Sequence, residues 1–251
     1  MPSGDRLWQA LLAELDAWQQ RGQPATLWWR DDDAEQDSPA LQRLNRLSIR
    51  FGIPLTLAVI PVDAKASLAP LFAANTRLQA WQHGYSHRNH APPAQRKCEL
   101  GDHRPLATVL EELQRGRVLL QGLLGERFAP VLVPPWNRLA AGLIPRLDGA
   151  GFCGLSTLGP RQPLALPTLN VHVDLINWRD GGRFAGEAAV LTQLLGHLQA
   201  RRLGRVDASE PSGIMTHHLA HDEACWAFLE RFFGALVHHP GLRWVNPLSA
   251  L

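Results

Sequence analysis

Two groups of residues with metal-binding chemistry each follow an apolar stretch of this chain. Asp31, Asp32 and Asp33 follow the first stretch, and His83 and His87 follow another about fifty residues later. Divalent ions such as zinc are held in proteins by neutral imidazole and carboxylate, and a catalytic site leaves a position open for water. The pattern therefore predicts a catalytic site for zinc or another divalent transition metal.

Each group also has an interpretation without metal. Gly84 places the histidine pair at a strand end or in a turn, where surface or hydrogen-bonded histidines are common. Three consecutive carboxylates without cationic partners repel one another and resist burial. The alternative is therefore a solvated acidic turn that caps a helix beginning near Ser38.

Composition limits the classes of protein. A chain of 251 residues with 45% hydrophobic content predicts one large α/β domain over residues 1–251. The formal net charge is +2 and the basic residues are scattered, so nucleic acid is not an expected partner. The start of the chain lacks a signal-peptide pattern and no apolar run approaches membrane-spanning length, which predicts a cytoplasmic protein. Cys98, Cys153 and Cys225 are expected to be reduced packing residues.

Strand and helix patterns alternate along the chain. Apolar runs predict strands at residues 27–30, 54–60, 78–82, 130–133, 152–156, 168–173, 213–216 and 242–245. Amphipathic patterns predict helices at residues 5–20, 39–50, 106–124, 186–202 and 222–238, with a shorter one at 139–148. This alternation predicts parallel strands joined by helices, in a closed or nearly closed (β/α) barrel.

Unusual polar residues follow most of these strands. They are Asp31 to Asp33, His83, His87, Trp136, Asn137, Arg138, His172, Asp174, His217 and His218. The active sites of parallel barrels lie at the carboxyl ends of the strands, so we expect all of these residues on one rim. The aspartates can supply a metal ligand and a general base, and His217 can protonate a leaving amine. This set is chemically complete for amide hydrolysis.

The order and spacing of these residues resemble the polysaccharide deacetylases, a family of metal-dependent carbohydrate esterases. Residues 30–34 (Arg-Asp-Asp-Asp-Ala) stand where the family has Thr-Phe-Asp-Asp-Gly, and residues 83–87 (His-Gly-Tyr-Ser-His) match His-Ser/Thr-x-x-His. Residues 133–137 (Val-Pro-Pro-Trp-Asn) echo Arg-x-Pro-x-Gly, and residues 174–178 (Asp-Leu-Ile-Asn-Trp) parallel Asp-x-x-Asp-Trp. Met-Thr-His at 215–217 matches Leu-x-His, so the resemblance spans residues 28–217.

The resemblance implies a distorted (β/α) barrel of seven or eight strands and assigns roles to its residues. Asp32 becomes the general base, Asp33 binds the metal with His83 and His87, and His217 becomes the general acid. This register is preferred because Ala34 then fills the family's small glycine position. The alternative pair, Asp31 and Asp32, better matches the spacing to the following helix.

Two departures from the family pattern affect the expected site. Val133 replaces the arginine of the third motif, so Arg30 or Arg138 is expected to orient the base. Asn177 replaces the second aspartate of the fourth motif, which leaves Asp174 or His172 as the expected partner of His217. Trp136 and Trp178 are expected at the substrate, with Asn137 and Asp31 in support. Trp28, Trp29 and Trp81 are expected in the core.

The predicted function is that of a metal-dependent hydrolase that removes an acetyl or other acyl group from an amide nitrogen of a sugar or related small molecule. One alternative is a catalytically decayed carbohydrate-binding protein on the same scaffold. A second alternative is a metal-dependent phosphoesterase. A phosphoesterase would need more ligands for a two-metal centre and more basic groups for phosphate. Only Arg30 and Arg138 are candidates to bind a phosphate group.

Overall fold

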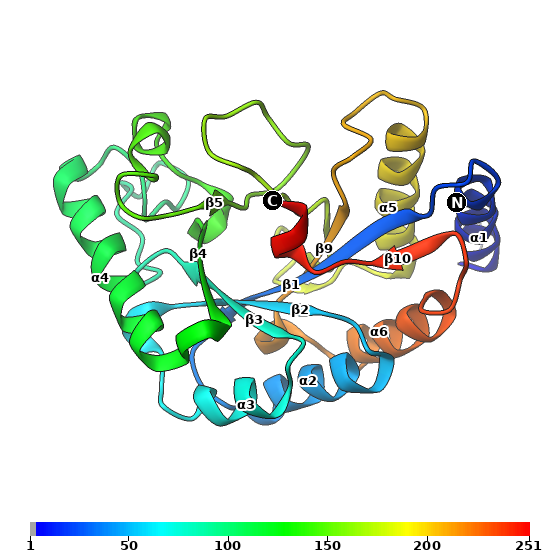
Figure 1. The fold of residues 1–251 in the computed structure, drawn as a ribbon, viewed down its shortest axis with the longest axis horizontal. Coiled ribbons are helices and arrows are strands. Elements are labelled where there is room, and N and C mark those ends of the chain that lie inside the picture. The colour runs from blue at the N-terminus through cyan, green and yellow to red at the C-terminus, as the bar shows by residue number, and fades with distance from the viewer. Residues whose placement is uncertain (1–3) are drawn as a thin grey trace.

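A computed structural model describes residues 4–251, in which a parallel β-sheet curls into most of a barrel with helices outside it (Figure 1). The sheet has the strand order β5-β4-β3-β2-β1-β9-β6, and β10 pairs with β1. Its strands are β1 (Ala25–Ala34), β2 (Leu55–Val59), β3 (Leu78–His83), β4 (Phe128–Val133), β5 (Gly154–Leu155), β6 (Val173–Asp174), β9 (Ser212–Thr216) and β10 (Leu242–Trp244). A separate antiparallel hairpin joins β7 (Ile176–Asn177) to β8 (Arg183–Phe184).

The two edges of the sheet are linked by isolated bridges. Leu155 pairs with Thr168 and Leu158 pairs with Val171, both in parallel. These pairs connect β5 to the segment that leads into β6, so backbone pairing continues around most of the ring. The predicted distorted (β/α) barrel of seven or eight strands is therefore confirmed.

Six α-helices lie on the outside of the sheet in the described part of the chain (Figure 1). They are α1 (Gly4–Gln20), α2 (Pro39–Phe51), α3 (Leu68–Ala74), α4 (Leu106–Leu124), α5 (Glu187–Arg202) and α6 (Glu223–Leu236). Helix α2 begins after Ser38, whose hydroxyl accepts a hydrogen bond from the Leu41 amide, and ends at Gly52 in a left-handed conformation. No helix of residues 4–251 is both long and apolar enough to cross a membrane.

Some predicted elements differ from the structure. Helix α3 was not predicted, because seven residues are too few for a clear period. The short helix expected at 139–148 is a 3-10 segment at Ala141–Arg146, since Pro145 cannot donate the backbone hydrogen bond of an α-helix. The strand expected at 168–173 is regular only at its end, in β6.

The predicted core positions are confirmed for three tryptophans. Trp28, Trp29 and Trp81 are fully buried, and the Trp28 and Trp81 rings pack with centroids 5.4 Å apart. The cysteines are free, and Cys98 and Cys225 are buried as expected. Cys153 is exposed, so its predicted packing role is wrong.

Candidate metal centre and active site

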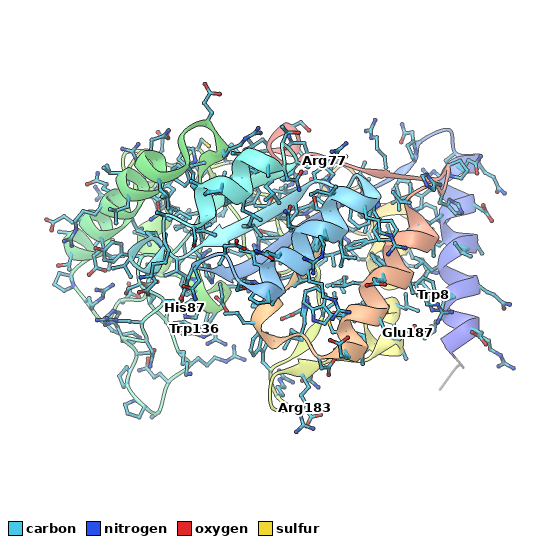
Figure 2. All side chains as sticks on the ribbon, turned by 90° about the horizontal axis from the view of Figure 1, so that it is seen from below. Trp8, Arg77, His87, Trp136, Arg183 and Glu187 are labelled. Carbon is cyan, nitrogen blue, oxygen red and sulfur yellow. The ribbon has the colours of Figure 1, made fainter. Side chains whose placement is uncertain are left out.

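A cavity of about 410 Å³ opens at the carboxyl ends of the strands. It is lined by Asp32, Asp33, His83, His87, Arg96, Trp136, Asn137, Arg138, Leu158, Asp174, Trp178, Arg179, Met215 and His217. Figure 2 shows His87 and Trp136 next to each other, at the level from which the loop after β3 extends downward in this view, and their ring centroids are 4.4 Å apart. The structure therefore brings together ten residues that the sequence placed at the site.

Asp33, His83 and His87 form a compact cluster in this cavity. The Oδ1 atom of Asp33 lies 3.1 Å from His83 Nε2 and 3.4 Å from His87 Nε2. This oxygen is buried and has no hydrogen-bond partner among residues 4–251. A buried carboxylate oxygen without a partner, facing two imidazole nitrogens, is a cation-binding arrangement.

The protonation of the cluster also suits a metal ion. His83 Nδ1 lies 3.0 Å from the Val133 carbonyl oxygen. Because a carbonyl only accepts, Nδ1 carries the hydrogen and Nε2 keeps a free lone pair directed at Asp33. When the His83 ring is protonated, its hydrogen bond and charge outweigh the effect of burial and hold the pKa of the Asp33 carboxyl below its usual range. The donor set therefore fits a divalent ion such as zinc, with coordination positions left for water.

Arg30 and Asp32 form a buried ion pair beside this cluster. Arg30 Nε donates to Asp32 Oδ1 at 2.8 Å, and the terminal nitrogen Nη2 donates to Oδ2 at 3.0 Å. The Arg30 guanidinium is fully buried and also donates to the Ser156 hydroxyl (2.7 Å) and to Asn137 Oδ1 (3.1 Å). The sequence analysis offered Arg30 or Arg138 as the residue that orients Asp32, and Arg30 is the one that pairs with it. Arg138 lines the cavity but donates to the Lys97 carbonyl.

Unusual backbone conformations are concentrated at this cavity. The non-glycine residues with positive φ in the described chain are Asp33 (70°), His87 (54°), Trp136 (57°) and Asn137 (54°), and all four line it. Such conformations cost about 1–3 kcal/mol each and persist where surrounding contacts enforce them. Local strain at a cavity wall is typical of a functional site.

Asp31 points away from the cavity and is fully buried. Its carboxylate accepts from the Thr216 hydroxyl (2.7 Å) and the His218 backbone amide (3.0 Å), and it lies 2.6 Å from His218 Nδ1. Burial is outweighed by the charge of His218, so the pKa of Asp31 lies below its ordinary value. The solvated acidic turn is therefore wrong, and so are the expected places of Asp31 and His218 on the cavity rim.

His217 lies between two carboxylates at the cavity wall. Its Nε2 is 4.0 Å from Asp32 Oδ2, and its Nδ1 is 3.8 Å from Asp174 Oδ1. The Trp178 indole donates to the other Asp174 oxygen at 2.9 Å and packs edge-on against the His217 ring. Burial raises the pKa of Asp174. The exposed Asn177 instead accepts from the Arg179 amide.

His172 does not lie on the rim, so its expected role as a partner of His217 is wrong. It precedes β6, and its Nδ1 accepts from the Gly213 amide at 3.0 Å near the start of β9. The ring stacks on His197 with centroids 3.6 Å apart, and its Nε2 is 3.4 Å from Glu210. Because Nδ1 accepts, Nε2 carries the hydrogen, and parallel rings do not direct lone pairs to one point. These features oppose a second metal centre.

The sequence analysis missed Glu99, which shapes the loop carrying His87. The Glu99 carboxylate is fully buried and accepts from the Tyr85 amide, the Ser86 amide and the Ser86 hydroxyl. Gly84 has a φ of +56°, and a Cβ added there would meet Glu99 and come within 2.6 Å of Pro135. The glycine after His83 therefore reflects close packing. The signal available in the sequence was an acidic residue within a long loop rich in proline, histidine and charged residues.

The comparisons with known proteins bear on the fold. No family model and no curated protein matches the sequence. A family 4 carbohydrate esterase from Streptomyces lividans in complex with acetate is 18% identical, with a TM-score of 0.57 over 90% of this chain and 95% of that one. A family 4 acetyl xylan esterase from Clostridium thermocellum in complex with a cobalt ion is 11% identical, with a TM-score of 0.52 over 90% and 89%. The resemblance to the polysaccharide deacetylases is thus confirmed in three dimensions, and this chain has their fold.

Proposed function

We propose that this protein is a divergent polysaccharide deacetylase, a metal-dependent hydrolase that removes an acetyl group from an amide nitrogen of a sugar or related small molecule. The observation that carries the proposal is the buried, unpartnered Asp33 oxygen facing His83 Nε2 and His87 Nε2. These three residues would hold the ion, with zinc as the expected metal. A bound divalent ion would lower the pKa of a water ligand and polarise a carbonyl oxygen.

Asp32 is the proposed general base. Its two oxygens each accept one hydrogen bond from Arg30 and retain lone pairs, and the residue lines the cavity. Arg30 fixes the plane of the carboxylate, so that Asp32 can take a proton from the attacking water. Proton transfer by a positioned side chain typically accelerates a reaction about 10²–10⁴-fold.

His217 is the proposed general acid. It lines the same cavity as Asp33 and His83, its Nδ1 is 3.8 Å from Asp174 Oδ1, and its ring packs against Trp178. Departure of the amine needs a proton on its nitrogen, and an imidazolium beside a carboxylate can donate one. The 3.8 Å separation from Asp174 is longer than a hydrogen bond, and such distances shorten when substrate binds.

Metal content and hydrolysis test this proposal together. Elemental analysis should find about one equivalent of zinc or another divalent ion in the protein. The His83→Gln variant should lose it, and His238→Gln, which changes an exposed histidine away from the cavity, should keep it. Absence of metal in every preparation, with no thermal stabilisation by added divalent ions, would favour the binding-protein alternative.

The chemical step is tested on the metal-loaded protein by acetate release from N-acetylated amino sugars. Asp32→Asn and His217→Gln should each lower kcat about 10²–10⁴-fold. Both variants should retain metal, because neither residue belongs to the Asp33 cluster. Retained kcat in both variants would contradict the assigned roles.

A further inference from the structure

Three arginines line the cavity from three different loops. Arg96 lies in the loop after β3, Arg138 follows β4, and Arg179 lies in the turn between β7 and β8. Arg96 and Arg179 have no carboxylate within 4.0 Å in the described chain, and Arg138 donates only to the backbone carbonyl of Lys97. The three guanidinium charges are therefore uncompensated by nearby side chains.

The carboxylates of the cavity do not balance this charge. Arg30 neutralises Asp32 through two hydrogen bonds. Asp33 faces two imidazoles and would be neutralised by a bound cation. Asp174 accepts hydrogen bonds from two neutral donors, the Trp178 indole and the Ile176 amide, so its charge offsets one of the three guanidinium groups. The remaining positive charge attracts an anion more strongly than a neutral molecule.

Two of the arginines are near neighbours in sequence of the two tryptophans that line the cavity. Arg138 follows Trp136 by two residues, and Arg179 directly follows Trp178. Trp178 is 54% exposed, so a large part of its indole is free to contact a ligand. The flat faces of aromatic rings pack against the apolar faces of sugar rings, and guanidinium groups bind carboxylate and phosphate in a two-pronged manner. The combination suits a ring that bears a negatively charged substituent.

We propose that the natural substrate is anionic: an N-acylated amino sugar or similar ring that carries a phosphate or carboxylate group, which Arg96, Arg138 and Arg179 bind. This inference deepens the proposed function and rests on it for the acyl group. Arg96 and Arg179 are exposed, whereas Asp32 is buried, so the anion would bind on the solvent side of the cavity. They bind the substrate and take no part in proton transfer.

Binding measurements separate this inference from the hydrolase proposal. The probes are N-acetylglucosamine, its 6-phosphate and the corresponding uronic acid, which share one ring and one amide and differ in charge. Calorimetry on the metal-loaded protein at low salt should give about tenfold or tighter binding for at least one anionic probe than for the neutral sugar. The two anionic probes distinguish phosphate from carboxylate. Equal affinities for all three probes, or no binding of any, would overturn the inference.

Variants test whether the arginines cause the preference for the anionic probe over the neutral sugar. Arg96→Gln combined with Arg179→Gln changes two exposed side chains, and should remove most of the preference for the anionic probe while retaining the metal. Arg205→Gln, an exposed arginine outside the cavity, should leave the preference unchanged. A preference that persists in the double variant and in Arg138→Gln would place the anion at the metal, and would overturn the assignment. Anion binding without any acetate release would instead contradict only the hydrolase proposal.

Discussion

Arg30 and Asp32 lie two residues apart on β1 and pair through two hydrogen bonds of 2.8 and 3.0 Å. In the motif that the sequence resembles, the arginine comes from a different segment, where this chain has Val133. The guanidinium of Arg30 reaches the Asp32 carboxylate from within the strand. Its Nη1 also donates to the Ser156 hydroxyl, and its Nη2 donates to Asn137 Oδ1 as well as to Asp32. A departure in one motif is thus accompanied by a compensating residue in another.

Replacing Arg30 should impair the orientation of Asp32, the proposed base, and should leave metal binding unchanged. Arg30→Lys keeps a positive charge but loses the two-pronged geometry, so we expect kcat to fall about 10²-fold with metal content unchanged. Arg30→Met leaves Asp32 buried without a partner and should lower the free energy of unfolding by about 3–5 kcal/mol. Steady-state kinetics and urea denaturation measure the two effects. Arg205→Lys, at an exposed position outside the cavity, is the matched control, and an equal loss of kcat there would contradict the assignment.

The register of the aspartates is tested by comparing Asp33→Asn with Asp31→Asn. Asp33→Asn should abolish metal binding, because it removes the carboxylate that faces both histidines. Asp31→Asn should keep the metal but lower the free energy of unfolding by about 2–4 kcal/mol, because His218 loses a buried ionic partner. Elemental analysis and denaturant unfolding of both variants decide the point. Metal retention in Asp33→Asn, together with metal loss in Asp32→Asn, would restore the alternative register, in which Asp31 is the base and Asp32 the ligand.

Gly84 should tolerate no side chain. In Gly84→Ala the new Cβ would come within 2.6 Å of Pro135 and contact the Glu99 carboxylate, at a φ that alanine rarely adopts. We expect a loss of about 2–4 kcal/mol in unfolding free energy and weaker metal binding, because the turn joins His83 to His87. Gly122→Ala in α4 is the control, since nothing lies within 4 Å of its added Cβ, and it should stabilise by up to about 1 kcal/mol. Similar stability of both variants would contradict this account.

His197 should make the protein less stable as the pH falls below about 6.5. Burial, together with the nearby His172 and Arg201, lowers the pKa of His197 to about 3 in the folded state. An unfolded histidine titrates near 6.5, so between these values the unfolded chain binds a proton that the folded protein does not. The unfolding free energy therefore falls on acidification, by about 1 kcal/mol between pH 6.5 and 5 after allowance for partial exposure.

The measurement for His197 is urea denaturation at pH 7 and pH 5. His197→Gln should lose less stability between these pH values than the unaltered protein, because glutamine does not titrate. His238→Gln, at an exposed position, should behave like the unaltered protein. An unchanged pH dependence in His197→Gln would show that other groups cause the loss.

The sequence by itself determined the fold class and most of the cavity. Alternating strand and helix patterns predict parallel strands, and the carboxyl ends of parallel strands share one edge, so residues as distant as Asp33 and His217 were expected together. The resemblance of residues 83–87, and of the aspartates followed by Ala34, to motifs of the polysaccharide deacetylases predicted that Asp33, His83 and His87 lie together. These features depend on local pattern and on topology, which a sequence carries directly.

Only the tertiary structure decided which of the three aspartates face the cavity and which one is buried away from it. Regular strand geometry alternates side chains between faces, which would separate Asp32 from Asp33. The left-handed backbone at Asp33 and the register shift between β1 and β2 turn both toward the cavity, and Asp31 is directed to His218. The pairing of Asp32 with Arg30 and the position of His172 away from the cavity likewise depend on contacts between residues far apart in sequence. Such contacts are set by the packing of the whole barrel, which no local pattern encodes.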